Sequence, residues 1–252
     1  MRKDNYIKLD ATGLHYKQLN EKINDVLDKN NSTYLTIEID NVCGQRYIAA
    51  GIKNDVKIIL NGVAGNDLGV FMDGPEVIVN GNAQDGVGNT MNSGKIIIKG
   101  SCGDVIGYGM RGGSIYIKEN AGYRVGIHMK AYKDKFPIVI IGGTVGDFLG
   151  EYMAGGIIIV LGLYDDKLPV GDFIGTGMHG GSIFIRREKI DERLLGKEVK
   201  VAQPTKEDFE LISKYLEEYC KYFSIDLEKV LKDKFIKLFP HSSRPYGKLY
   251  VY

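Results

Sequence analysis

The stretch Gly88-Asn89-Thr90-Met91, followed five residues after its methionine by Ile96-Ile97-Ile98, is one copy of a pattern that fills the middle of the chain. The phrase Gly-x-x-Met occurs six times, and its methionines are 19, 19, 19, 24 and 25 residues apart. The chain has seven methionines, and all except Met1 stand at this position. A fixed period near 20 residues indicates a solenoid built from repeated coils. The six methionines, called the ladder methionines below, are Met72, Met91, Met110, Met129, Met153 and Met178.

Each repeat also carries a short apolar run that begins five residues after the ladder methionine. After Met129 the run is delayed to Ile138-Val139-Ile140 by an insertion, Ala131 to Pro137, and a second insertion, Leu163 to Pro169, explains the other long step. These runs are too short and too apolar on both faces for a solvent-facing antiparallel sheet. The other runs are Val77-Ile78-Val79, Ile96-Ile97-Ile98, Ile115-Tyr116-Ile117, Ile158-Ile159-Val160 and Ile183-Phe184-Ile185.

The density of glycine in the repeats excludes a helical repeat. All but four of the 33 glycines lie between Gly51 and Gly181, and glycine costs about 1 kcal/mol at each helical position. We therefore predict an all-β core, a parallel β-helix of about six to seven coils of roughly 20 residues each. Parallel crossovers are almost always right-handed, so a right-handed coil is expected. The ladder methionines should stack inside it, and glycine should serve the corners where φ is positive.

The segments on either side of the repeats read as caps. A helix is expected to open at Asp10-Ala11-Thr12-Gly13 and run to about Lys29, followed by a strand from Tyr34 to Ile39. An open solenoid end exposes unpaired backbone, so this helix is the natural cover for it. The chain is accordingly divided into an N-terminal cap of helix and strand (1–50), the β-helix (51–187) and a C-terminal helical segment with an extended tail (188–252).

Two helices are expected in the C-terminal segment. Thr205 followed by Asp208 forms a capping-box pattern at the start of the first. Ser224 is expected to cap the second, which carries apolar residues up to Phe235, and Pro240 should end it. The remaining residues read as an extended tail.

Composition excludes several classes of function. A net charge of +1 provides no field that would attract nucleic acid or an anionic membrane. No apolar stretch is long enough to span a bilayer, and Met1-Arg2-Lys3-Asp4 leads into no signal segment. Three scattered cysteines without a Cys-x-x-Cys pair suit a reducing, cytoplasmic location and argue against an iron–sulfur or zinc site made by this chain alone. These residues are Cys43, Cys102 and Cys220.

The reactive residue types yield no catalytic constellation. His128 and His179 each stand beside a ladder methionine and read as turn or surface histidines. Gly103-Asp104, Gly146-Asp147 and Gly171-Asp172 could stack into a metal-binding row, but bonding of the carboxylates to local turn backbone is the better interpretation. Ser114 and Ser182 follow glycine pairs, yet neither lies in the Gly-x-Ser-x-Gly elbow of a serine esterase. No catalytic, cofactor-binding or metal-binding residue is assigned.

The coils resemble the GXGXG domain that ends the large subunit of glutamate synthase. The resemblance covers about residues 40 to 186, and the whole layout is similar to a free-standing archaeal version of that domain. The repeat also occurs in one of the subunits of formylmethanofuran dehydrogenase, and the C-terminal helices favour the glutamate synthase branch. The stretches that carry it are Val63-Ala64-Gly65-Asn66-Asp67-Leu68-Gly69, Asn80-Gly81-Asn82-Ala83-Gln84-Asp85-Gly86-Val87-Gly88, Glu151-Tyr152-Met153-Ala154-Gly155-Gly156-Ile157-Ile158-Ile159-Val160-Leu161-Gly162 and Gly175-Thr176-Gly177-Met178-His179-Gly180-Gly181, with Cys43-Gly44-Gln45-Arg46 as the lead-in.

The resemblance implies a non-catalytic structural subunit of a split glutamate synthase. In that family the β-helix braces a glutaminase part, which makes ammonia, against a flavin-binding synthase part, which uses it on 2-oxoglutarate. FMN and iron–sulfur clusters would then belong to partner subunits, and Arg2 stands where a glutaminase would have its cysteine. Alternatives are a component of formylmethanofuran dehydrogenase, like the subunit of that enzyme that carries this repeat, and a stand-alone ester hydrolase. A homo-oligomer is left open.

One further pattern predicts an interface. The middle residue of each apolar run should face away from the core, yet none of them is polar. Stacked, they would form a continuous apolar surface, called the outer fence, which needs a cover. We expect the C-terminal helices to cover part of it and a partner chain the rest. Its predicted members are Ile78, Ile97, Tyr116, Val139, Ile159 and Phe184.

Overall fold

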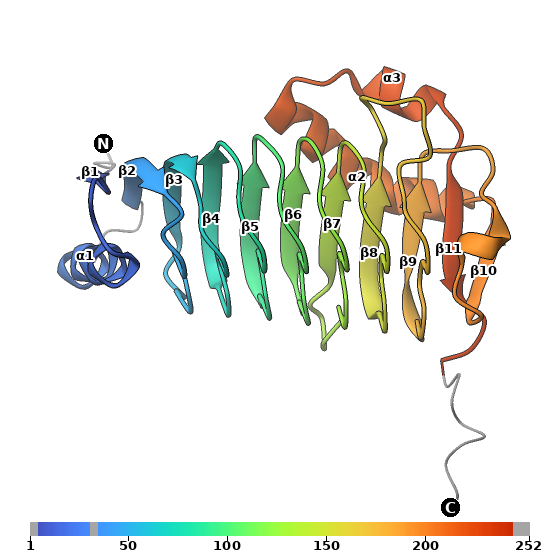
Figure 1. Ribbon diagram of the computed structural model, residues 1–252, viewed down its shortest axis with the longest axis horizontal. Coiled ribbons are helices and arrows are strands. Elements are labelled where there is room, and N and C mark those ends of the chain that lie inside the picture. The colour runs from blue at the N-terminus through green and yellow to red at the C-terminus, as the bar shows by residue number, and fades with distance from the viewer. Residues whose placement is uncertain (1–4, 31–34, 244–252) are drawn as a thin grey trace, which may run out of the picture.

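The computed structural model describes residues 5–30 and 35–243 and shows a parallel β-solenoid of about seven turns (Figure 1). Within these ranges, eleven strands form one sheet in the order β1-β2-β3-β4-β5-β6-β7-β8-β9-β11-β10. The strands are β1 (Asn5–Asp10), β2 (Leu35–Cys43), β3 (Val56–Val63), β4 (Asp73–Asn80), β5 (Ser93–Ile98), β6 (Gly113–Ile117), β7 (Pro137–Ile141), β8 (Ala154–Val160), β9 (Gly180–Ile185), β10 (Val199–Ala202) and β11 (Ile236–Pro240).

The strands β1 to β9 are parallel, whereas β11 runs antiparallel to β9 and β10 antiparallel to β11. Helix α1 (Tyr16–Lys29) lies at the N-terminal end of the row of strands. Helix α2 (Lys206–Phe223) crosses the sheet, and the short helix α3 (Leu227–Lys232) follows it. A 3-10 turn, η1 (Glu192–Leu194), comes after β9. The β-rich core with helices near the two ends confirms the predicted fold class.

Each coil sends five residues into the interior at fixed positions. Counted from the ladder methionine, they stand eight and four residues before it, at the methionine itself, and five and seven residues after it. In the coil of Met129 the insertion moves the last two to Val139 and Ile141. All six ladder methionines are fully buried in this core, as predicted. The coil that ends at Met110 contributes Cys102, Ile106, Met110, Ile115 and Ile117.

The glycine of each Gly-x-x-Met phrase has two separate causes. Its φ is positive in every copy, for example +68° at Gly88. A Cβ at Gly88 would also stand 2.4 Å from the δ-methyl of Ile115 in the next coil. The same close approach recurs at Gly126 with Ile158. Only glycine lets the turn take its left-handed conformation while the next coil packs against it.

The N-terminal end is closed by α1, whose Leu19, Ile23 and Leu27 join the solenoid core. The helix starts later than predicted, with His15 as N-cap. Asp10 accepts hydrogen bonds from Thr12 N at 2.9 Å and Asn41 Nδ2 at 2.9 Å, so this segment forms a turn rather than a first helical turn. Strand β1 before it was not predicted. Of the predicted strand from Tyr34, the described part begins at Leu35.

The C-terminal end differs most from the prediction. Thr205 caps α2 with Asp208 in a capping box, as expected. Ser224, however, ends α2 in a left-handed conformation, and Asp226 caps α3 instead. The predicted helix does not reach Phe235, because α3 ends at Lys232. The next residues, 236–240, form β11, which pairs with β9 and closes the sheet. Of the predicted tail, residues 244–252 lie outside the described part, and the domain boundaries at 50 and 187 stay predictions.

The outer fence exists, with one member corrected. Val139 pairs with Ile115 and Ile158 and faces the core, so its predicted place belongs to Ile140, which pairs with Tyr116 and Ile159. The apolar run of β7 is longer than three residues and follows an insertion, so a shift of one residue looked equally acceptable in the sequence. In a strand, such a shift turns every side chain to the opposite face.

Candidate functional site

Helix α2 covers most of the outer fence. Ile97, Tyr116 and Phe184 are almost completely buried and form a second core with Ile212, Leu216 and Tyr219 of α2. The expected cover within the chain is therefore confirmed for five fence members, Ile97, Tyr116, Ile140, Ile159 and Phe184. Beyond them Ile78 is half-buried, and the same outward row continues through Ile59 to Glu38 and Lys8. The apolar surface therefore ends close to where α2 ends.

Polar contacts fix the position of α2 on the sheet. Tyr116 Oη donates a hydrogen bond to Glu218 Oε2 at 2.6 Å, and Lys95 pairs with the other oxygen of the same carboxylate. Nearer the end of the helix, Tyr222 Oη donates to Glu76 Oε2 at 3.1 Å. At the start of α2, Asp208 pairs with Lys237 of β11 at 2.6 Å. The helix is thus held from β4 to β11.

This interface should weaken at alkaline pH. Burial raises the pKa of Tyr116, Tyr219 and Tyr222, and Glu218 and Glu76 raise the pKa of Tyr116 and Tyr222 further. The stabilisation from these neutral phenols is complete below the unfolded pKa of about 10 and is lost as pH rises above it.

We expect the urea midpoint to fall between about pH 9 and about pH 11.5, and the double variant Tyr116→Phe/Tyr222→Phe to show a smaller fall. Urea melts followed by circular dichroism at several pH values measure this. Equal slopes for both proteins would contradict the assignment.

The residues considered for catalysis are not brought together. Ser114 is buried, and Ser182 lies on a separate strand, β9. The ring of His128 stacks on Tyr152 with centroids 5.2 Å apart, and Nδ1 of His179 lies 3.1 Å from the carbonyl of Gly177. The two histidine rings are therefore engaged by the turns beside them rather than by either serine.

The aspartates of the Gly-Asp pairs stack as rows, but their bonds differ from the prediction. Asp104 Oδ1 accepts from the backbone N–H of Tyr123 at 2.8 Å, and Asp147 Oδ1 from that of Asp172 at 2.9 Å. Each bond therefore joins one coil to the next rather than closing a local turn. No group of three or more metal-ligating side chains occurs in the described residues.

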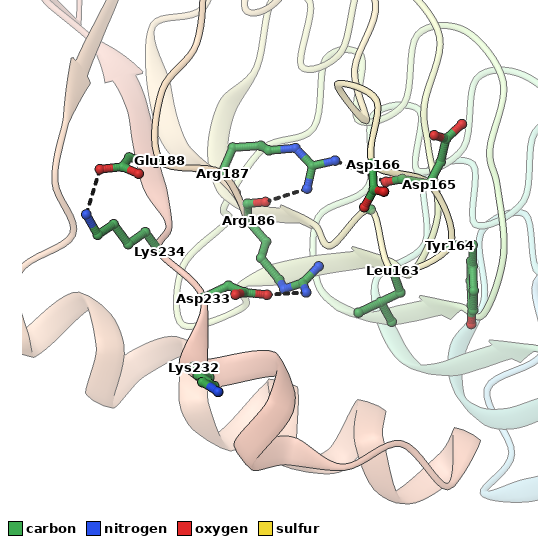
Figure 2. Close-up of a pocket in the computed structure, with 11 residues that line it drawn as sticks. Leu163, Tyr164, Asp165, Asp166, Arg186, Arg187, Glu188, Lys232, Asp233 and Lys234 are labelled. Atoms are coloured by element: carbon green, nitrogen blue, oxygen red, sulfur yellow. Dashed lines mark hydrogen bonds and ion pairs between the residues drawn. The ribbon is translucent and has the colours of Figure 1, made fainter.

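A polar pocket of about 640 Å³ lies where the second insertion meets the residues after β9 and α3 (Figure 2). Its charged side chains are balanced in sign and mostly satisfied within the protein. Arg186 pairs with Asp233, Lys234 pairs with Glu188 at 2.6 Å, and Arg187 donates to the carbonyl of Asp165 at 3.1 Å. We therefore interpret the pocket as a structural contact, in which ion pairs and hydrogen bonds hold the insertion and the end of α3 against the last coil.

The turns that precede the ladder methionines present a second feature, which sequence reasoning missed. We name it the turn face: the side chains one, two and five residues before each ladder methionine. Arg124 Nε pairs with Glu151 Oε2 at 3.0 Å and its guanidinium lies 4.5 Å from the ring centroid of Phe148. The aromatic side chains of the turn face are Phe71, Tyr108, His128, Phe148, Tyr152 and Phe173.

All of these aromatic side chains except Phe71 contact a neighbouring ring along the solenoid, and all except Phe148 are exposed. Phe148 lies 5.0 Å from Phe173, and Tyr108 lies 5.8 Å from His128, measured between ring centroids. Phe173 remains 54% exposed and Tyr108 41% exposed. A contiguous exposed aromatic surface of this kind marks an interaction site more often than ordinary surface.

The backbone of the turn face is strained. Val105, His128, Phe148 and Tyr152 have φ between 52° and 62°, a conformation that costs a residue with a Cβ about 1–2 kcal/mol. The same positions hold Gly86, Gly109 and Gly177 in other coils. The fold therefore accepts glycine at these positions and does not need the aromatic side chains. Counting positions back from each methionine would have revealed these rows in the sequence.

Comparison with known proteins places the chain. It matches the family model described as GXGXG motif over residues 15–241, from just before α1 to just after β11. It is similar to an uncharacterized protein of Methanocaldococcus jannaschii, with 50% identity over 254 residues that cover 97% of this chain and 96% of the relative. In the described residues, no helix has the length and apolar character needed to cross a membrane. The chain belongs to the GXGXG family.

Proposed function

We propose that this chain is a non-catalytic structural subunit of a split glutamate synthase. It braces the subunit that releases ammonia from glutamine against the flavin-dependent subunit that adds the ammonia to 2-oxoglutarate. The observation that carries this proposal is the family match, which spans the capped solenoid from α1 to β11. The chain thereby takes part in cytoplasmic glutamate biosynthesis, as a component of an oxidoreductase complex whose FMN and iron–sulfur clusters belong to the partners.

The physical character of the fold suits a brace. Rows of backbone hydrogen bonds join each coil to the next, and side-chain bonds such as Asp104 to Tyr123 N reinforce them. Both ends of the core are closed, by α1 and by β11 with β10. A solenoid of this kind holds its two ends and its exposed faces at fixed separations. That rigidity is what two separate catalytic subunits need from a third chain.

Reconstitution tests the proposal. The glutaminase and synthase subunits of the same organism are purified and mixed with and without this chain. We expect the chain to raise glutamine-dependent formation of glutamate about tenfold or more, because tethering raises the effective concentration of one partner at the other. Glutamate formation from added ammonium should not change, which is the internal control. Absence of both co-elution and stimulation would contradict the proposal.

A further inference from the structure

We propose that the turn face is the docking surface for a different protein, whose contact patch is apolar and bordered on one edge by lysine or arginine side chains. This inference deepens the proposed function and rests on it for the identity of the partner, a glutamate synthase subunit. The first support is the strained backbone. His128 and Tyr152 hold left-handed conformations that Gly109 and Gly177 provide without strain in other coils. Strain at exposed positions that the fold can do without points to function.

The second support is the arrangement of the side chains. The stack of Phe148 and Phe173 and the stack of His128 and Tyr152 are joined by the ion pair of Arg124 with Glu151. Rings fixed by stacking lose little freedom on binding, so they suit a protein interface. The surface that remains free is largely apolar, which calls for an apolar contact patch on the partner.

The third support is the charge along the two edges of the turn face, which favours a different protein over a second copy of this chain. Immediately before the turn face, six residues ahead of the ladder methionine, stands an acidic edge made of Asp85, Asp104, Asp147 and Asp172. On the other side, one residue after the methionine, the charged side chains are Arg111, Lys130 and Asp73, and Asp73 pairs with Lys135 at 2.9 Å. In Asp85, Asp104 and Asp147 one carboxylate oxygen accepts a backbone N–H of the next coil, and the negative charge remains. The four charges of the acidic edge outnumber the two cations, so a second copy of this chain would not neutralise them. A partner with a basic edge fits better, because complementary charge favours the right partner and speeds its association.

The main experiment is hydroxyl-radical footprinting. The tagged full-length chain is isolated with its partners from the cells that naturally produce it and compared with the chain alone. We expect a several-fold fall in the oxidation rates of Tyr108, Tyr152 and Phe173 in the complex. Tyr164 is the matched control, since it is 55% exposed against 54% for Phe173 and lies at the polar pocket. Its oxidation rate should not change.

The outcomes separate this inference from the proposed function. Glutamate synthase subunits bound with the turn face unprotected would overturn the inference alone. Other proteins bound with the turn face protected would overturn the proposed function and leave the docking surface in place. A chain that is isolated alone, or as a dimer of itself protected at this face, would overturn the proposed occupant.

Two variants test the separate contributions of rings and charge. Tyr152→Gly/Phe173→Gly should abolish co-elution while the melting temperature stays within about 4 °C of the wild type, since glycine already occupies equivalent positions. Asp104→Asn/Asp147→Asn keeps the Oδ1 acceptor, as Asn66 does toward the N–H of Asp85 at 3.3 Å. It should slow association about tenfold.

The matched charge control is Asp25→Asn/Asp28→Asn on the exposed side of α1. Unchanged association for the Asp104/Asp147 variant, or retention of the partner by the glycine variant, would overturn the docking surface.

Discussion

Replacing Tyr116 with aspartate is expected to release α2 from the sheet and to lower the free energy of unfolding by more than about 4 kcal/mol. The side chain is completely buried and packs against the rings of Tyr219 and Tyr222, with centroids 6.4 and 5.7 Å away. Aspartate would remove most of this packing and place a carboxylate in an apolar layer beside Glu218. A buried charge without a partner is among the most destabilising changes known.

The measurements are a urea melt and hydrogen exchange of residues 206–223. Tyr116→Phe keeps the packing and loses only the hydrogen bond to Glu218, so a cost of about 1–2 kcal/mol is expected. Tyr6→Asp is the surface control, because Tyr6 is 55% exposed and its replacement should change stability by about 0.5 kcal/mol or less. If Tyr116→Asp keeps both the wild-type urea midpoint and the wild-type protection of α2 from hydrogen exchange, then α2 does not pack on the outer fence as described.

The sequence was sufficient for the solenoid because its signal is periodic and local. Each coil repeats one arrangement of inward residues, and the spacing of Met91 and Met110 alone sets the length of a coil. The rows four and eight residues before each methionine were equally regular. They were missed because small residues such as Ala83 and Cys102 do not form an apolar run.

The closing strand β11 could not be found in the same way. Its sequence follows a predicted helix and ends at Pro240, which local reasoning takes as a helix stop. What makes it a strand is pairing with Ile183 and Ile185, about fifty residues earlier in the chain. Such a pairing is decided by the exposed edge of β9, and a segment of five residues does not indicate which strand it pairs with.

The turn face was missed for a different reason. An aromatic residue such as Phe148 or Tyr152 in a turn reads as an ordinary surface residue. Its significance lies in a positive φ at a position where glycine would be the default. Backbone conformation therefore supplied the signal, and the sequence contributed only the regular spacing of the rows.

The ladder provides the second large effect, at Met110. This side chain is completely buried in the solenoid core, at a position that six successive coils fill with methionine. Met110→Ala removes buried atoms that the rigid coils on either side cannot replace by collapsing, so a loss of about 2–5 kcal/mol is expected. Met110→Leu keeps the volume and the apolar character and should cost less than about 1.5 kcal/mol. Urea melts followed by circular dichroism measure both changes.

Comparing the two variants separates two possible roles of the methionines, filling space in the core and a chemical role of the sulfur atom. A methionine ladder that served a chemical role through sulfur would lose as much with leucine as with alanine. A ladder that only packs should tolerate leucine. Leu211→Ala on the exposed side of α2, where the side chain is 38% exposed, is the control for loss of apolar atoms outside the core, and it should change stability by less than about 1 kcal/mol. Neutral results for both Met110 variants would show that the ladder contributes no packing energy and that the coils are held by their backbone hydrogen bonds alone.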